Sequence, residues 1–224
     1  DRNGRLLATD VEVPSLFVDP ALVIDRDELV EKLSTVLPDI DARQLRNDLS
    51  DRSRRFLWIR RGLSPQIAQK VHDLGLPSLG FRKELRRAYP GGELAGHVLG
   101  GVNIDNKGVA GIEKWIDDSG AVEGVHTAEF SDHAPVRLSL DIGVQHSLED
   151  ELETAMRRYV SHAAAGLVMD IRTGEVIASA SLPRVDPLFP QTALDPKHID
   201  RVMTGTYELG SVFKTLTVAM ALDE

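Results

Sequence analysis

The sequence predicts an α+β fold, and three observations support this. Of the 224 residues, 42% are hydrophobic and 27% are charged, which is the balance of a soluble globular protein that buries a core. Some segments alternate apolar and polar side chains with the period of a strand, whereas others repeat them with the period of a helix. The length allows one large domain or two ordinary ones, and we place the best boundary near Ala134-Pro135.

The first 60 residues predict strands and two helices. Turn residues at 1–4 lead into expected strands at 5–9 and 11–18, the second with an edge or bulge at Pro14. Residues 41–49 predict a short helix with an acidic start, and residues 55–60 predict a strand. A helix over 25–37, ended by a proline, is predicted from one apolar face that holds Leu29, Val30, Leu33, Val36 and Leu37.

The next segments carry clear boundary signals. Ser64 as cap, Pro65 in the first turn and Gly75 beyond the end mark a helix. Residues 79–89 are expected to be extended, and their basic side chains favour a solvated strand face or local salt bridges over nucleic-acid binding. A Pro-Gly turn and two short helices should follow, the first helix ended by the glycine pair at 100–101.

The last third predicts a helix and a hairpin. Residues 126–139 are expected to be extended, and Asp141 should cap a long amphipathic helix over 142–161. Apolar segments at 165–171 and 175–181 predict a hairpin, and the nearly continuous apolar character of the first indicates a strand buried on both faces. Residues 193–204 should form a loop with a short helix.

Composition excludes several functions. The net charge of −9 argues against nucleic acid as a partner, and the absence of cysteine excludes disulfides and thiolate zinc sites. The spacing of His126 and His133 does not suit a metal, so we expect neither metal nor cofactor. No apolar stretch has the length of a membrane span.

The pair Ser211 and Lys214 is the candidate catalytic site. Residues three apart lie one turn apart on the same helical face, and the free N–H groups of a helix start favour negative charge. A lysine that burial keeps neutral can accept the serine proton, which gives an activated nucleophile. The alternative is structural, with Ser211 as a helix cap and Lys214 as a solvated side chain.

Motifs along nearly the whole chain resemble those of class B penicillin-binding proteins. The segment Tyr-Glu-Leu-Gly-Ser-Val-Phe-Lys over 207–214 is similar to the family's Tyr-Glu-Pro-Gly-Ser-Thr-x-Lys and departs from it at Leu209 and Val212. Leu140-Asp141-x-x-x-Gln145 resembles the start of the family's transpeptidase domain. Four N-terminal motifs match in order: Asp1-Arg2-Asn3-Gly4, Arg87-x-Tyr89-Pro90, Ala95-x-His97-Val98-x-Gly100 and Gly108-x-x-Gly111-Ile112-Glu113.

This resemblance implies an elongated N-terminal pedestal or dimerisation domain over 1–135, followed by the first part of a penicillin-binding transpeptidase domain over 136–224. Ser211 would be acylated by peptidoglycan stem peptides or by β-lactams, with Lys214 as its base, in septal cell-wall synthesis. The family also implies the periplasmic face of the bacterial inner membrane, a single-pass anchor upstream of Asp1, partnership with a SEDS-type glycosyltransferase and other division proteins, and self-association.

The family's Ser-x-Asn and Lys-Thr-Gly motifs do not follow Ser211, so we expect this chain to be inactive by itself. A non-catalytic interaction module for division proteins and a β-lactam sensor remain alternatives. We also expect Arg2, Arg87 and Glu113 to form an ion-pair cluster, and residues after about 183 to be weakly ordered or to pack between molecules.

Overall fold

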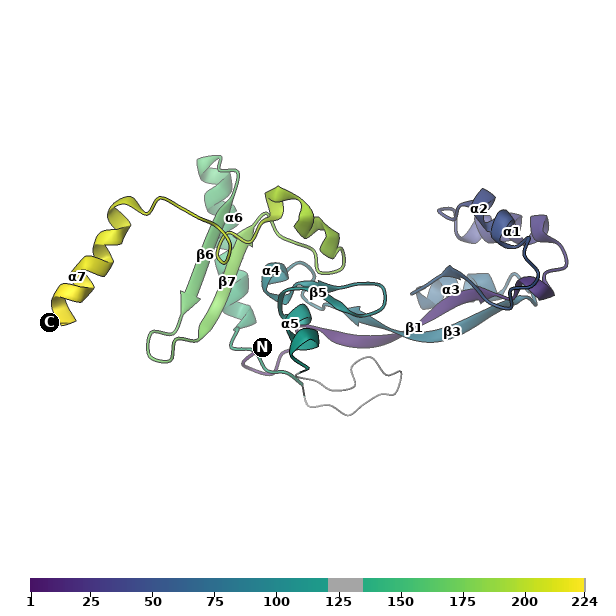
Figure 1. The fold of residues 1–224 in the computed structure, drawn as a ribbon, viewed down its shortest axis with the longest axis horizontal. Coiled ribbons are helices and arrows are strands. Elements are labelled where there is room, and N and C mark those ends of the chain that lie inside the picture. Colours follow the sequence, from purple (N-terminus) through teal and green to yellow (C-terminus); the bar gives the residue numbers. More distant parts are fainter. Residues whose placement is uncertain (121–134, 224) are drawn as a thin grey trace.

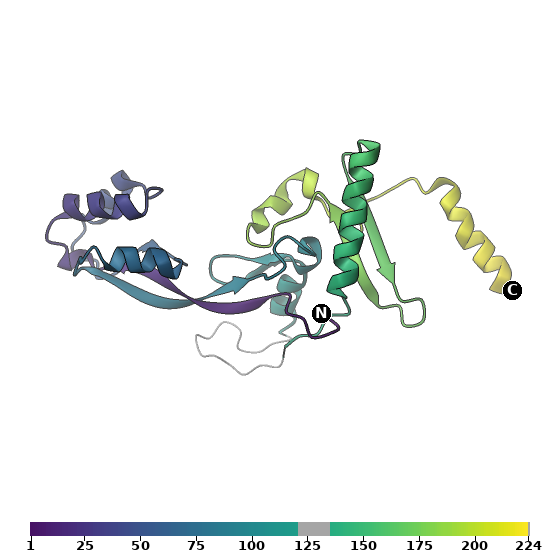
Figure 2. The same cartoon turned by 180° about the vertical axis from the view of Figure 1, so that it is seen from behind.

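The computed structural model describes residues 1–120 and 135–223. These residues form two groups of mixed helices and strands: the first, residues 1–120, is built on a long strand pair with helices at its far end, and the second, residues 135–223, lies at the near end of that pair (Figures 1 and 2). The α+β class is confirmed. Most of the predicted extended segment at 126–139, with His126 and His133, lies outside the described residues. No strand is assigned over 135–140, where the Ser139 hydroxyl instead donates to the Val176 carbonyl at 2.7 Å.

A three-stranded antiparallel sheet runs through the first group in the order β2-β1-β3, with β1 at Thr9–Val18, β2 at Leu57–Arg60 and β3 at Leu79–Ala88. β1 and β3 pair along their whole lengths. The strand expected at 11–18 is therefore confirmed and begins at Thr9. Pro14 pairs with Lys83 of β3, and it is tolerated because β2 pairs only with 16–18 of β1, so no strand lies on the other side of the proline. Residues 5–8 are not a strand, since Arg5 bonds back to Asp1 in a turn.

Three helices pack on the far end of this sheet and form what we call the helical head. They are α1 at Arg26–Val36, α2 at Ala42–Asp48 and α3 at Pro65–His72, following the one-turn 3₁₀ helix η1 at Pro20–Leu22. All three predicted helices are confirmed, each capped by the side chain at its first boundary: Asp25, Asp41 and Ser64. Their core holds Leu16, Val18, Leu29, Val30, Leu33, Leu37, Leu45, Leu49, Leu63 and Val71.

Short elements occupy the near end of the long strands. They are α4 at Gly96–Leu99, β4 at Gly101–Val102, β5 at Gly108–Ala110 and α5 at Gly111–Ser119. The predicted glycine stop of α4 is confirmed, because Gly100 has φ +75°. A side chain there would also place its Cβ 1.9 Å from the Ala110 carbonyl oxygen, so only glycine allows this close approach.

The second group packs α6, at Ile142–Tyr159, against the antiparallel hairpin of β6 at Ala164–Met169 and β7 at Val176–Leu182. The predicted helix, its Asp141 cap and the hairpin are confirmed. The prediction that the first strand is buried on both faces is wrong. Leu148 and Leu152 of α6 cover one face at Gly166, whereas Leu167 and Met169 on the opposite face are exposed.

The chain after β7 forms one-turn 3₁₀ helices η2 at Pro190–Leu194, η3 at Pro196–His198 and η4 at Gly210–Phe213, and then α7 at Lys214–Asp223. The expectation of weak packing after residue 183 is wrong for the first part of this segment, because Val185 and Pro187 are buried against the body of the protein. The apolar side chains of α7 are exposed to solvent and are not covered by any other described element.

Candidate functional site

The predicted nucleophile lies in η4, directly ahead of α7. Gly210 adopts φ +54°, and the backbone N–H of Lys214 bonds to the carbonyls of Ser211 and Val212. The Ser211 hydroxyl therefore stands at the start of a helix, as the sequence predicts, with Lys214 one turn further along. Among the described residues no hydrogen bond joins the Ser211 hydroxyl to the Lys214 amine.

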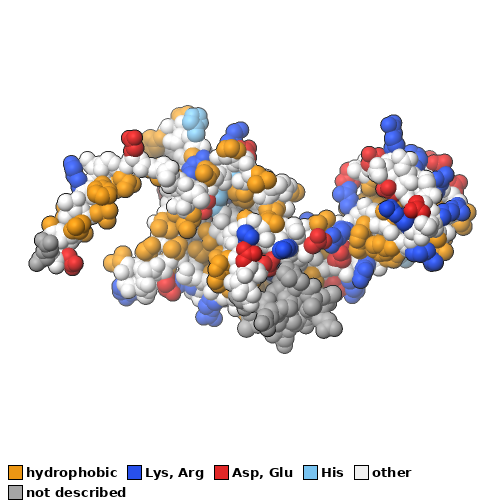
Figure 3. Space-filling model, viewed as in Figure 1, with side chains coloured by type: hydrophobic (Ala, Val, Ile, Leu, Met, Phe, Trp, Pro, Cys, Tyr) orange, Lys and Arg blue, Asp and Glu red, His pale blue; other side chains and the backbone are white. Residues whose placement is uncertain are grey.

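Both side chains are exposed, and so is the whole of α7. Figure 3 shows α7 standing apart from the rest of the molecule, with hydrophobic side chains open to solvent. The exposed apolar side chains are Leu216, Val218, Met220 and Leu222. A lysine that acts as a general base requires burial, and the described part of the chain leaves Lys214 exposed. The two reacting groups are thus placed, but they are not enclosed.

A tyrosine connects the nucleophile segment to the packed body. The Tyr207 hydroxyl donates to the Arg201 carbonyl at 3.0 Å, and Gly205 lies beneath the ring, where a Cβ would come within 2.4 Å of that hydroxyl oxygen. Arg201 in turn donates its backbone N–H to the Ser181 hydroxyl at 3.0 Å. The segment is therefore bonded to β7 at Arg201, ten residues before Ser211, and Tyr207 bonds back to that same residue.

Two of the three residues expected in an ion-pair cluster, Arg87 and Glu113, form an ion pair. The Arg87 Nε lies 2.8 Å from the Glu113 Oε1, and a second guanidinium nitrogen lies 3.3 Å from Asp10. Burial opposes the charge of Arg87, but the hydrogen bond and the charge of Glu113 outweigh it and raise the pKa of the guanidinium. Arg2 is not a member, because it pairs with Glu175 of the hairpin at 3.3 Å.

Tyr89, of the same motif as Arg87, is buried beside this pair. Burial first, and the negative charge of Glu113 second, raise the pKa of its phenol. The hydroxyl has no hydrogen-bond partner among the described residues. The motif residues of this region therefore build a buried scaffold, and nothing here reaches Ser211.

The first motif attaches the chain start to α6. Arg2 donates its backbone N–H to the Leu140 carbonyl at 2.8 Å, and the Asn3 amide donates to the Asp141 carboxylate at 2.9 Å. The Asp1 carboxylate accepts from the Ile142 N–H at 3.3 Å. The motif thus holds the beginning of the first group against the beginning of the second.

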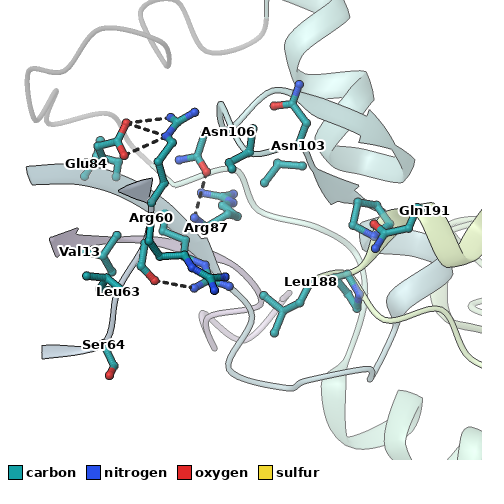
Figure 4. A pocket seen from close by; sticks show the side chains of 18 of the residues that line it. Val13, Arg60, Leu63, Ser64, Glu84, Arg87, Asn103, Asn106, Leu188 and Gln191 are labelled. Carbon is teal, nitrogen blue, oxygen red and sulfur yellow. Dashed lines mark hydrogen bonds and ion pairs between the residues drawn. The ribbon is translucent and has the colours of Figure 1, made fainter. Parts of the chain in front are cut away.

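A cleft that the sequence does not reveal lies between the helical head and the segment after β7. Its volume is about 890 Å³, and residues from both sides line it. Figure 4 shows Val13, Leu63 and Ser64 on the side of the sheet and Leu188 and Gln191 on the opposite side. The walls are mainly apolar and include the side chains of Arg60, Arg61 and Arg87, each of which pairs with a carboxylate of residues 1–120. No periodicity signals this cleft, because its walls are distant in sequence.

Within residues 1–120 and 135–223 no group of three or more histidines, aspartates or glutamates is placed to hold a metal ion. The helices of the same residues include none that combines the length and hydropathy of a bilayer span. Sequence reasoning missed a buried polar pair, Glu149 and Arg184, whose contacts join the two groups of elements. A carboxylate at i+4 from Gln145 on the inward face of α6 was the available signal.

Comparisons with known proteins match two families along the chain. The family described as the penicillin-binding protein dimerisation domain matches residues 1–119, and the penicillin-binding protein transpeptidase domain matches residues 164–224. The second match contains both Ser211 and Lys214 in their Ser-x-x-Lys spacing.

Similar curated proteins carry related names. The probable peptidoglycan D,D-transpeptidase FtsI of Caulobacter vibrioides is 38% identical over 100% of this chain, and the probable peptidoglycan D,D-transpeptidase PenA of Neisseria meningitidis is 35% identical over 100%. The peptidoglycan D,D-transpeptidase FtsI of Escherichia coli is 28% identical over 99%. The chain spans 37%, 42% and 41% of the lengths of these three relatives.

A crystal structure of a peptidoglycan synthetase from Bifidobacterium adolescentis is similar in fold, with a TM-score of 0.57 and 24% identity. The likeness covers 97% of this chain and 48% of the other. At this identity it supports the fold alone.

Proposed function

Because the chain belongs to the class B penicillin-binding proteins, we propose that it is part of a serine-type peptidoglycan D,D-transpeptidase that crosslinks stem peptides during septal wall synthesis. The observation that carries this proposal is the transpeptidase-domain match over 164–224, which includes Ser211 and Lys214 one turn apart. The names of the relatives from Caulobacter and Escherichia support the division-type assignment.

The chemistry assigns one role to each residue. The Ser211 hydroxyl oxygen attacks the carbonyl of the penultimate D-alanine while neutral Lys214 takes its proton. The bond to the terminal D-alanine breaks, the departing amine takes the proton from Lys214, and an acyl-enzyme on Ser211 remains. The amine of a neighbouring stem peptide then attacks the ester, and its lost proton returns to the serine oxygen through Lys214. β-Lactams acylate the same oxygen.

The described residues do not form an active-site pocket around Ser211. The oxyanion that forms during attack needs two donors, and the Ser211 N–H at the start of α7 is suited to be one of them. The second would come from the strand that carries the family's Lys-Thr-Gly motif. We therefore assign activity to the complete protein, and to this chain the nucleophile and its base.

We divide the chain into a pedestal over 1–135 and a transpeptidase part over 136–224. Two observations support this division: the family matches end at 119 and resume at 164, and the helical head and the hairpin lie at opposite ends of the long β1/β3 pair (Figure 1). We also propose that the complete protein acts on the periplasmic face of the inner membrane, anchored upstream of Asp1, beside a SEDS-type glycosyltransferase and other division proteins. The relatives' name, peptidoglycan D,D-transpeptidase, supports action on the cell wall.

A second function, as an interaction module, is favoured by the cleft between the helical head and residues 187–194. The first family, a dimerisation domain, supports self-association through residues 1–135. The same match argues against a β-lactam sensor, which would lack these motifs.

Replacement of Lys214 by methionine in the full-length protein tests the proposed chemistry. We expect crosslinking and labelling by a fluorescent penicillin to fall by at least about a hundredfold, because removal of a general base costs this order of rate. Lys197→Met, which removes an exposed lysine from η3, is the matched control. Full turnover by the Lys214 variant would refute the assignment.

A further inference from the structure

The carboxylate of Glu149 on α6 is almost completely buried, with 3% of the residue exposed. Its Oε1 accepts hydrogen bonds from the Ala95 N–H at 2.9 Å and from the Gln145 side chain at 2.7 Å, and its Oε2 accepts from the Arg184 Nε at 2.5 Å. A buried carboxylate is stable only when such partners replace water. Glu149 is thus the point where α6, the residue before α4 and the segment after β7 meet.

This meeting point crosses from the first group of elements to the second. Ala95 adopts φ 58°, a conformation that residues other than glycine rarely take, and thereby directs its N–H to Glu149. The neighbouring Gly96 approaches the chain so closely that a Cβ would lie 1.9 Å from the Val185 carbonyl oxygen. We call this contact between 95–99 and 184–187, with Glu149 beneath it, the seam.

The seam also fixes the segment that leads to the nucleophile. Arg184 forms a second ion pair with Glu153, one helical turn from Glu149. A His198 ring nitrogen donates to the Arg184 carbonyl at 2.6 Å, and a His97 ring nitrogen from α4 donates to the His198 carbonyl at 2.8 Å. Residues 184–198 are therefore held from both sides, by α4 of the first group and by α6 of the second.

Short hydrogen-bonded steps connect the seam to Tyr207, four residues before Ser211. The Ser181 hydroxyl donates to the Ile199 carbonyl at 2.9 Å and accepts from the Arg201 N–H. The Tyr207 hydroxyl then bonds to the Arg201 carbonyl, and the nucleophile follows four residues later. A displacement of α4 that opens the seam would be transmitted along these contacts to the start of α7.

We propose that Glu149 and Arg184 are positioning residues for Ser211. Through them, the contact of the N-terminal group of elements with α6 and residues 184–187 regulates the acylation of Ser211. This inference rests on the proposed function of Ser211. A partner that moves α4 relative to α6 changes the acylation rate without touching the nucleophile. Opening the seam would remove partners from the buried carboxylate of Glu149, and an unpaired buried charge is costly.

The test uses the full-length protein and a fluorescent penicillin, with the limiting acylation rate constant and the dissociation constant of the non-covalent complex measured separately. Glu149→Gln keeps the shape of the side chain and removes the charge that faces Arg184. Gly96→Ala forces the seam open from the other side. We expect each to lower the limiting rate constant by between about tenfold and about a hundredfold, as small misplacements of reacting groups do, with an unchanged dissociation constant.

Matched controls separate positioning from general damage. Glu151→Gln removes an exposed charge from the same helix, and Gly91→Ala places a Cβ at an ordinary 3.5 Å from the Leu94 side chain. Both should acylate like wild type. Wild-type rate constants in both seam variants would overturn the proposal. If Gly96→Ala does not fold, the rate constant of Glu149→Gln by itself supports or overturns it.

A lower labelled fraction with an unchanged rate constant in that fraction would indicate loss of folded protein only, and would also overturn the proposal. Failure of wild type to be labelled, or equal labelling of wild type and Ser211→Ala, would overturn the proposed function and this inference together. Labelled wild type with fully active seam variants would overturn this inference alone.

Discussion

The ion pair between Arg87 and Glu113 allows a quantitative test of the N-terminal scaffold. The perturbation is Glu113→Gln, which preserves shape and one acceptor but removes the charge. Side-chain exposures of 22% for Arg87 and 9% for Glu113 make this a largely buried pair. Removal of one partner from a buried pair costs about 3–5 kcal/mol, because it leaves an uncompensated charge.

Two features of the structure reduce that cost. Asp10 lies 3.3 Å from the same guanidinium and keeps part of its charge compensated, and the exposed fraction of Arg87 is reached by solvent. We therefore expect Glu113→Gln to lower the free energy of unfolding by about 2 kcal/mol. The assay is urea unfolding at neutral pH, followed by circular dichroism.

The control lies on the same helix. Lys114 and Asp118 form a pair at 2.8 Å with side-chain exposures of 53% and 60%, and such exposed pairs contribute at most about 0.5 kcal/mol. Asp118→Asn should therefore leave the unfolding free energy almost unchanged. A Glu113→Gln variant as stable as Asp118→Asn would refute the conclusion that the motif residues act as a buried scaffold.

Two further predictions concern stability. Leu33→Ala, in the fully buried core of the helical head, should cost about 2–5 kcal/mol in the same urea assay, whereas Ile24→Ala, at a residue 88% exposed, should cost less than about 0.5 kcal/mol. Hydrogen bonds from the Val144 N–H, and then from the Asn3 amide, lower the pKa of the Asp141 carboxyl. Its stabilising contribution is therefore present above the unfolded pKa of about 3.9 and is lost as the pH falls through the lower folded value. Between about pH 5 and about pH 2 the melting temperature of wild type should fall more steeply than that of Asp141→Asn.

Equal losses of unfolding free energy in Leu33→Ala and Ile24→Ala would contradict the assigned core of the helical head. For Asp141, parallel melting curves of wild type and variant across the acid range would contradict the capping role of this carboxylate at α6.

Local signals in the sequence were sufficient for much of the fold. Asp25, Asp41 and Ser64 each precede a helical pattern, and each caps the helix that it predicts. Gly100 likewise ends α4 where the sequence places the stop. These features depend on residues within one turn of each other, so a single chain segment contains the necessary information.

Long-range contacts were predicted less well. Arg2 was expected beside Arg87 but pairs with Glu175, which is 173 residues away in sequence. The amphipathic pattern predicts that α6 buries an apolar face, yet its most buried positions are Gln145 and Glu149. A polar side chain can be buried only when a partner satisfies it, and hydrophobic periodicity does not show the partner.

The exposure of β6 and α7 could not be read from the sequence for a related reason. Apolar strands and helices are expected to be covered, but the pattern does not say by which segment. In the described residues, Met169 of β6 and Met220 of α7 remain open to solvent.

The identity of the acylated atom tests the central claim most directly. The full-length protein is treated with a β-lactam and digested with trypsin, and the peptide from Val202 to Lys214 is sequenced by mass spectrometry. The account predicts that the mass of the opened β-lactam is carried by Ser211 and by neither Thr204 nor Thr206 of the same peptide. A stable adduct on any other residue, with Ser211 unmodified, would contradict it.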